Sequence, residues 1–173
     1  MEEPERRYLA LWFPFLASDR VRHAPNDSEP TEAPLVLVER QGAATRIQAV
    51  DSRAQAHGIA PGMAFAAAQA LVPDLAIRDA APEADQEWIE RIADLCERYT
   101  PMVALDAADG VTLDLTDCAA AFGGEDALLA DLEARLGHWS DDVRTALAGS
   151  PAAAQALARF RTMPAANVAA GLR

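Results

Sequence analysis

Short apolar runs in the first half of the chain have the length and the bounding residues of β-strands. They cover residues 7–13, 34–40 and 45–50, with Pro14 ending the first run and a turn around Gly42 joining the other two. Four further segments lie between or after these runs: helices at 15–22, 52–58 and 64–73, and a short extended segment at 75–79. The pattern predicts one long buried strand followed by a small mixed α/β unit.

The second half of the chain has longer and more regular periods. Residues 82–99 place apolar side chains three and four positions apart, which predicts an amphipathic helix, and residues 123–139 predict a second one. Between the helices, residues 102–116 alternate as a β-hairpin with Asp109-Gly110 as its two-residue turn. The apolar face of the first helix consists of Trp88, Ile92, Leu95, Cys96 and Tyr99. The closing elements are a strand at 142–149 and a short helix opened by Pro151.

The order of these elements indicates the fold class. The first strand and the elements after residue 81 follow the order strand, helix, strand, strand, helix, strand. That order is the ferredoxin-like βαββαβ arrangement. The chain is therefore predicted to be an α+β protein whose ferredoxin-like sheet carries residues 14–80 as an inserted α/β subdomain.

Composition and charge argue against several classes of function and site. The formal net charge is −12, from 15 Lys+Arg against 27 Asp+Glu. Because a broad DNA-binding face needs clustered cations, this balance predicts weak or no DNA binding. The two cysteines and three histidines have no zinc-ligand spacing, and the missing disulfide pattern favours a reduced, cytoplasmic protein. Neither a signal peptide nor a membrane span is expected.

Several short motifs now stand in one order along the chain. The segment "RIQAVDSRAQAHGIAPGMAFAAAQALVPDL" is followed by "LDLT" at 113–116 and by "AGSPAAAQALARF" at 148–160. In this order they resemble the fingers and palm motifs of the Y-family translesion DNA polymerases, and the resemblance runs from about residue 8 to residue 161. It implies a palm strand at 1–13, a fingers-like insertion at 14–80 and the rest of the palm at 81–161. The tail at 162–173 is Ala-rich and weakly patterned, and it is expected to be poorly ordered.

The resemblance also places the positions at which the family binds metal ions. Y-family catalysis is a two-metal phosphoryl transfer in which carboxylates hold divalent ions. Leu11 and Phe13 stand at the two first-strand ligand positions, Asp109 stands at the hairpin Asp, and Gly110 stands at the adjacent Glu. One carboxylate remains, and Asp109 also suits a turn. No metal ligand and no cofactor are therefore expected, with Mg²⁺ needed only if the chain is an active nucleotidyltransferase.

The nucleotide-binding positions implied by the resemblance are altered as well. Ser52 and Gln55 replace the Tyr and Arg with which the family touches the triphosphate, and Leu16 replaces the aromatic that excludes the ribose 2′-hydroxyl. Phe15 is retained. Arg53 is one residue away from the expected position, and one residue turns a helical side chain by about 100°. The resemblance thus implies a degenerate nucleotide site.

Lost acids are typical of the ImuB-type branch of this family. The resemblance implies a catalytically inactive bacterial module that acts as an adaptor in damage-induced (SOS) mutagenesis and translesion synthesis. Its expected partners are a RecA-like mutasome component, an error-prone C-family polymerase and the sliding clamp, mostly through regions beyond Arg173. Two alternatives remain open at this point: an active metal-dependent nucleotidyltransferase, and a palm-like regulatory domain that binds a small ligand.

Two further features have weaker functional interpretations. The segment "FGGEDALL" at 122–129 is similar to the GGDEF signature of diguanylate cyclases, although its glycines are expected to open a helix and not to form a hairpin tip. Asp106 and Asp114 fall on facing strands of the predicted hairpin, where paired carboxylates would favour a weak cation site.

Overall fold

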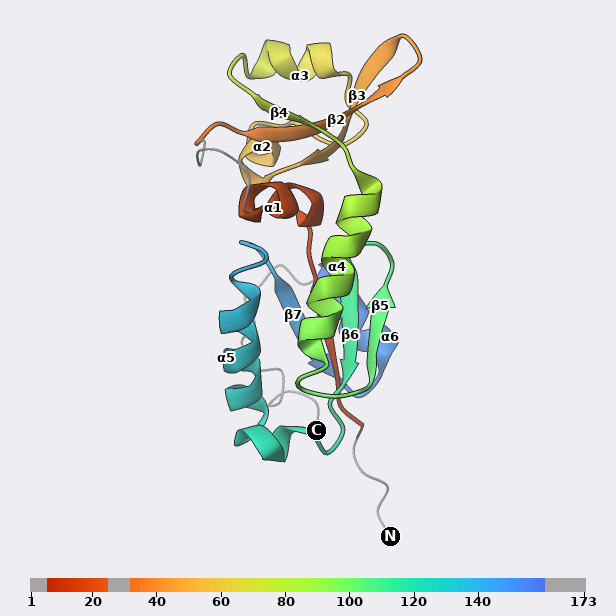
Figure 1. The fold of residues 1–173 in the computed structure, drawn as a ribbon, viewed down its shortest axis with the longest axis vertical. Helices are drawn as coiled ribbons and strands as arrows, with labels where there is room; N and C mark the ends of the chain where they lie inside the picture. The colour runs from red at the N-terminus through yellow and green to blue at the C-terminus, as the bar shows by residue number, and fades with distance from the viewer. Residues whose placement is uncertain (1–5, 25–31, 161–173) are drawn as a thin grey trace. The chain divides into compact units, whose positions relative to one another are not determined.

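A computed structural model describes residues 6–24 and 32–160, and the tail predicted at 162–173 lies outside these ranges. The chain divides into two compact units. The first unit is formed by the chain up to Pro14 and from Gln86 onward, and the second unit is Phe15–Asp85. Figure 1 draws the elements of both units. The boundaries of the insertion that the sequence predicts, residues 14 and 80, remain a prediction.

The first unit contains the ferredoxin-like sheet. Its strands follow the order β5-β6-β1-β7, and every neighbouring pair is antiparallel. This order confirms the predicted βαββαβ arrangement, because β1 lies between the second and third strands that follow it in this unit. The elements are β1 (Tyr8–Trp12), α4 (Pro82–Cys96), β5 (Val103–Asp106), β6 (Gly110–Asp114), η1 (Ala119–Phe122), α5 (Glu125–Leu136), β7 (Arg144–Ala148) and α6 (Pro151–Phe160).

Alternation along β1 gives the sheet two different faces. Leu9 and Leu11 point to one face and are fully buried. Ala10 points to the other face, where it packs with Ala146 of β7 and with small residues of α6. Because these side chains are small, α6 lies close against β1 and β7. Figure 1 shows α4 in front of the sheet and α6 behind it. The buried helix residues are Ile89, Ile92, Cys96, Leu128, Leu132, Leu136, Ala154 and Ala158.

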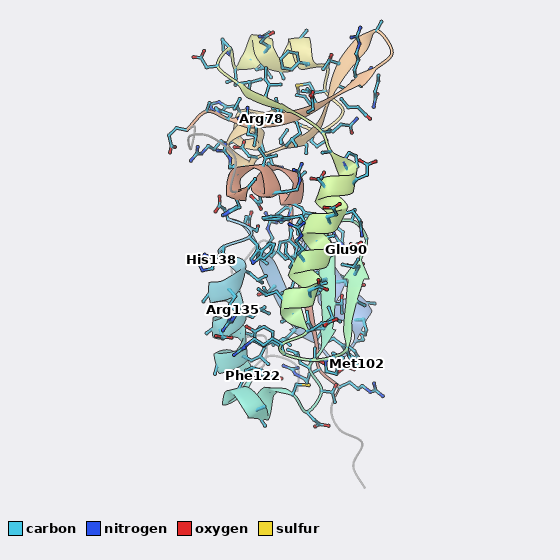
Figure 2. The ribbon with its side chains drawn as sticks, viewed as in Figure 1. Arg78, Glu90, Met102, Phe122, Arg135 and His138 are labelled. Atoms are coloured by element: carbon cyan, nitrogen blue, oxygen red, sulfur yellow. The ribbon has the colours of Figure 1, made fainter. Side chains whose placement is uncertain are left out.

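Aromatic contacts tie the two long helices of this unit together. Trp88 of α4 and Trp139, just after α5, have ring centroids 4.7 Å apart. The Tyr99 hydroxyl donates a hydrogen bond to Asp131 of α5 at 2.6 Å, and its ring lies 5.2 Å from that of Phe122. Figure 2 labels Phe122, just before α5, and Arg135, in the last turn of α5. The predicted helix face is confirmed, with Ile89 as a buried residue that the prediction omitted.

The second unit has its own sheet and core. Its strand order is β3-β2-β4, with β2 antiparallel to β3 and parallel to β4. The core cluster consists of Val36, Val38, Ile47, Val50, Ala54, Ile59 and Ala68. The elements are α1 (Leu16–His23), β2 (Leu35–Gln41), β3 (Ala44–Val50), α2 (Ser52–Ala56), α3 (Phe65–Leu71) and β4 (Ala76–Asp79). This is the small α/β subdomain that the sequence predicted.

The hairpin turn differs from the prediction. Asp106 pairs with Gly110, so the loop is the three residues 107–109 and Gly110 is the first residue of β6. The positive φ of the turn, 56°, is at Ala107. A Cβ atom on Gly110 would lie 2.8 Å from the carbonyl oxygen of Asp106. The glycine therefore serves a close backbone approach, which a turn-based interpretation of the Asp-Gly pair misses.

The interpretation of Asp106 and Asp114 as a paired cation site is wrong. Asp106 and Asp114 lie at opposite ends of the β5–β6 pairing, because Gly110 faces Asp106 while the Asp114 N–H bonds to the Met102 carbonyl. The shorter pairing moves the two carboxylates apart. The expectation for the glycines is confirmed: Gly123 and Gly124 lie between η1 and α5, with Gly124 as the N-cap of α5 and Gly123 at a φ of 88°. Over residues 6–24 and 32–160, no helix has the length and apolarity to cross a membrane.

Candidate functional site

The end of β1 and the β5–β6 hairpin bring four sequence-predicted positions together. Trp12 faces Gly110 across the β1–β6 ladder, and Leu11 faces Val111. Past the end of the ladder, the Phe13 N–H donates to the Asp109 carbonyl at 2.9 Å. Leu11, Phe13, Asp109 and Gly110 thus lie at one end of the sheet, in positions set by backbone pairing.

Three of these four positions offer no side-chain oxygen to a divalent metal ion. Leu11 is 1% exposed and Phe13 is fully buried, and both are apolar. Gly110 has no side chain to offer. Mg²⁺ takes oxygen ligands in near-octahedral geometry, so a single carboxylate is a poor site for it. Within the described residues, no group of three or more His, Cys, Asp or Glu side chains is placed to hold a metal ion.

Asp109, the remaining acid, already has a partner for each carboxylate oxygen. The indole N–H of Trp12 donates to Oδ2 at 2.9 Å. Nη1 of Arg159 donates to Oδ1, also at 2.9 Å. Both donors come from residues far from Asp109 in sequence, one on β1 and one on α6. The carboxylate therefore joins the hairpin to two other elements of the unit.

Arg159 also binds a second acid of the same hairpin. Its Nη2 donates to Asp106 Oδ2 at 2.9 Å and to the Asp106 carbonyl at 3.3 Å. The Arg159 side chain is 23% exposed, so water screens these ion pairs only in part. Burial by itself disfavours the charged guanidinium, but the hydrogen bonds to Asp109 and Asp106 outweigh it and raise the pKa of Arg159 above its usual value. The arginine is thus a permanent cation between two carboxylates.

Trp12 completes this cluster. The guanidinium carbon of Arg144 lies 5.0 Å from the centre of its ring, and that of Arg159 lies 5.7 Å away. Both distances are within the range of cation–π attraction. Gln155, one turn before Arg159 on α6, donates to the Thr112 hydroxyl of β6 at 3.1 Å and helps to hold the helix in register. We call Trp12, Asp106, Asp109 and Arg159 the Arg159 cluster.

Sequence reasoning missed Arg159 and Trp12 as partners of Asp109. Trp12 was interpreted only as a buried strand residue, and Arg159 only as part of a family-like motif. One signal was available: Arg159 is the single charged residue of α6, whose other residues are apolar or small apart from Gln155. A lone arginine beside a stripe of alanines needs a partner, but its identity depends on tertiary structure.

The nucleotide-site positions lie in the second unit. Phe15 and Leu16 are buried there, 7% and 6% exposed, at the start of α1. Ser52 and Gln55 are exposed on α2. Asp51 caps α2 through Oδ1, which accepts the Ala54 N–H at 2.7 Å, and its Oδ2 accepts a hydrogen bond from Arg22. Two of the four predicted nucleotide-site positions are thus apolar and buried, and the other two are polar, uncharged and exposed.

Arg53 is the nearest cation to these α2 positions in sequence. It pairs with Glu32 at 2.9 Å, and both side chains are well exposed. Such an exposed pair contributes little to stability.

Comparisons with known proteins assign the chain to a family. Residues 15–159 match the family model described as "IMS: impB/mucB/samB family". Over 103 residues the chain is 47% identical to the protein ImuB of Caulobacter vibrioides, in strains NA1000 / CB15N and ATCC 19089 / CB 15 alike. That alignment covers 60% of this chain and 22% of the relative, so the chain spans about a fifth of the length of these curated relatives.

Solved structures of low sequence identity share the fold. The crystal structure of DinB from Sulfolobus solfataricus matches with a TM-score of 0.69 at 17% identity, covering 88% of this chain and 45% of that one. A post-insertion binary complex of Dbh DNA polymerase matches with a TM-score of 0.72 at 15% identity and the same coverage. The chain belongs to the impB/mucB/samB family and has the palm-and-fingers fold of the Y-family DNA polymerases.

Proposed function

We propose that this chain is a catalytically inactive polymerase-like module that acts as an adaptor in damage-induced mutagenesis. One observation carries the proposal: Asp109, the acid that remains at a metal-ligand position, is bound on one oxygen by Arg159 and on the other by Trp12. A two-metal mechanism needs several free carboxylates around two cations. Here a guanidinium supplies the positive charge, and Leu11, Phe13 and Gly110 supply no ligand.

The adaptor role rests on the family and on the similarity to ImuB. An inactive palm contributes to mutagenesis by binding other proteins. The proposed partners are a RecA-like component, an error-prone C-family polymerase and the sliding clamp, bound mostly through parts of the longer protein beyond this chain. The proposed location is the cytoplasm. DNA is a weak ligand at most for the chain itself, because its net charge is −12.

A calorimetric titration of the chain with a deoxynucleoside triphosphate and Mg²⁺ tests the loss of catalysis. We expect no saturable binding in the wild type. Metal-dependent binding that Asp109→Asn abolishes would contradict the proposal and favour the active nucleotidyltransferase. Primer extension is a poorer test here, since the chain covers 45% of the matched polymerase structures.

The adaptor role needs a cellular test in the longer protein. We expect Asp109→Asn to leave damage-induced mutation frequency at the wild-type level, because asparagine keeps an oxygen that accepts from Trp12 and no catalysis is lost. Western blotting controls for protein level. A fall in mutation frequency to that of a gene deletion, at unchanged protein level, would indicate that the acid is used in catalysis.

A further inference from the structure

The Arg159 cluster has the geometry of a filled cation site. Three oxygen atoms converge on Arg159: Oδ1 of Asp109, Oδ2 of Asp106 and the Asp106 carbonyl. Carboxylate and carbonyl oxygens are the ligands of hard divalent cations. The group that they surround here is a guanidinium, which is a cation that belongs to the chain.

Gly110 gives a second, independent observation. A Cβ atom built on Gly110 would lie 3.1 Å from Nη2 of Arg159 and 3.2 Å from Oδ2 of Asp106. A side chain at position 110 therefore enters the space that the guanidinium occupies. By the family resemblance, position 110 is that of a catalytic glutamate. The lack of a side chain at position 110 therefore leaves room for the Arg159 guanidinium.

Packing and hydrogen bonds set the position of Arg159. Ala154 and Ala158 of α6 pack on Ala10 and Ala146 of the sheet, and these four residues form a buried cluster. The Gln155–Thr112 hydrogen bond sets the position of the helix one turn earlier. Arg159 then reaches two acids with one hydrogen bond each from Nη1 and Nη2 at 2.9 Å. A fixed guanidinium with this geometry competes well with a weakly bound divalent ion.

We propose that Arg159 is an internal substitute for a metal ion, which fills a cation site formed by Asp106 and Asp109 and keeps divalent and trivalent ions out. The inference rests on the proposed loss of catalysis, and goes beyond it by naming the residue that closes the site. Removal of the guanidinium leaves two carboxylates and a carbonyl oxygen facing a space of cation size. The variant chain then binds a hard cation at this place.

Terbium luminescence tests the proposal on the chain itself, because the Trp12 indole lies against Asp109 and sensitises a nearby Tb³⁺ ion. We expect weak, non-saturating Tb³⁺ emission from the wild type. Arg159→Gln is expected to give saturable emission at a concentration lower by about tenfold or more, since three oxygen ligands become free. Adding Asp109→Asn to this variant is expected to abolish the gain. Mn²⁺ is expected to compete with Tb³⁺ for the new site.

Arg135→Gln is the matched control. Arg135 on α5 also pairs with an aspartate, Asp131, at 3.0 Å, but both side chains are half-exposed and no second acid of the described residues pairs with this guanidinium. This variant is expected to leave Tb³⁺ emission unchanged. Circular dichroism monitors folding of every variant. If Arg159→Gln fails to fold, Arg159→Met keeps the apolar stem and serves in its place.

Three results would overturn the proposal. One is equal Tb³⁺ affinity in the wild type and in a folded Arg159 variant. Another is gained binding that persists in the Asp109→Asn double variant. The third, which needs no Arg159 variant, is saturable wild-type emission that Asp109→Asn removes. An absence of gain in the variant, with no nucleotide binding in the wild type, would reject this inference and leave the proposed function standing.

Discussion

Arg7 donates two hydrogen bonds to the Glu125 carboxylate, from Nε to Oε1 at 2.6 Å and from Nη2 to Oε2 at 2.7 Å. This forked pair joins the residue before β1 to the first residue of α5. The hydrogen bonds from Arg7 are the main cause of the lowered pKa of Glu125, and burial opposes them. Both side chains are partly exposed, at 25% and 31%, so solvent screening limits the contribution of the pair to about 1 kcal/mol.

The pair makes the free energy of unfolding depend on pH. Since the folded-state pKa of Glu125 lies below its unfolded value, the stabilisation is complete above the ordinary Glu pKa of about 4.3 and is lost as the pH falls through the folded value. Urea unfolding of wild type and Glu125→Gln should therefore differ most at neutral pH and converge in acid. Glu90→Gln, on the exposed face of α4 labelled in Figure 2, is the control. A difference that grows in acid would contradict the assignment.

At the scale of the element, the β5–β6 hairpin depends on a residue without a side chain. Gly110 opens β6 and faces Asp106 across the hairpin. A Cβ atom here would lie 2.8 Å from a backbone oxygen, a contact that only a shift of the strand relieves. The same hairpin carries Asp109 and holds α6 through Arg159. Strain at Gly110 is therefore expected to reach the packing of α6 on the sheet.

Gly110→Ala is expected to lower the free energy of unfolding by about 1–3 kcal/mol, as overpacking does in a close-packed interior. Gly137→Ala is the matched control. Gly137 has a φ of −59°, and its added Cβ would find its nearest contacts at 3.7 Å, so its effect should stay below about 1 kcal/mol. Thermal and urea unfolding measure both changes. Equal effects of the two substitutions would show that the close approach at Gly110 carries no cost.

At the scale of the whole molecule, charge decides which macromolecules the chain attracts. Arg22, Arg53, Arg135 and Arg159 all form ion pairs with acids of the chain itself. Acids outnumber cations by 27 to 15, and the resulting net charge of −12 repels phosphates. This charge distribution disfavours binding to a nucleic-acid backbone.

Fluorescence anisotropy with a labelled primer–template duplex checks this expectation. At physiological salt we expect no saturable binding up to the micromolar range, and the weak signal at low salt should fall steeply as salt is added. The same duplex with an established DNA-binding protein controls for labelling. A sub-micromolar Kd at physiological salt would contradict the charge argument.

Local patterns in the sequence determined most of the elements. Apolar residues repeat with the period of a strand or a helix, and that period is a property of neighbouring residues. The order of the predicted elements was sufficient for the ferredoxin-like class, and the motif order was sufficient for the family. The positions of Leu11, Phe13, Asp109 and Gly110 came from the family resemblance, and strand pairing places them at one end of the sheet.

Tertiary structure alone decided how those positions interact. Asp109 and Arg159 are 50 residues apart, and nothing in either local pattern indicates the pairing. The register of the hairpin also depended on tertiary structure. The Asp-Gly pattern predicts Gly110 in the turn, but Gly110 lies in β6, where it closely approaches the Asp106 carbonyl. Long-range ion pairs and steric contacts depend on how elements pack, and packing is set by the whole core. The sequence therefore predicted which acids of the family are replaced, and the fold showed that Arg159 holds Asp109.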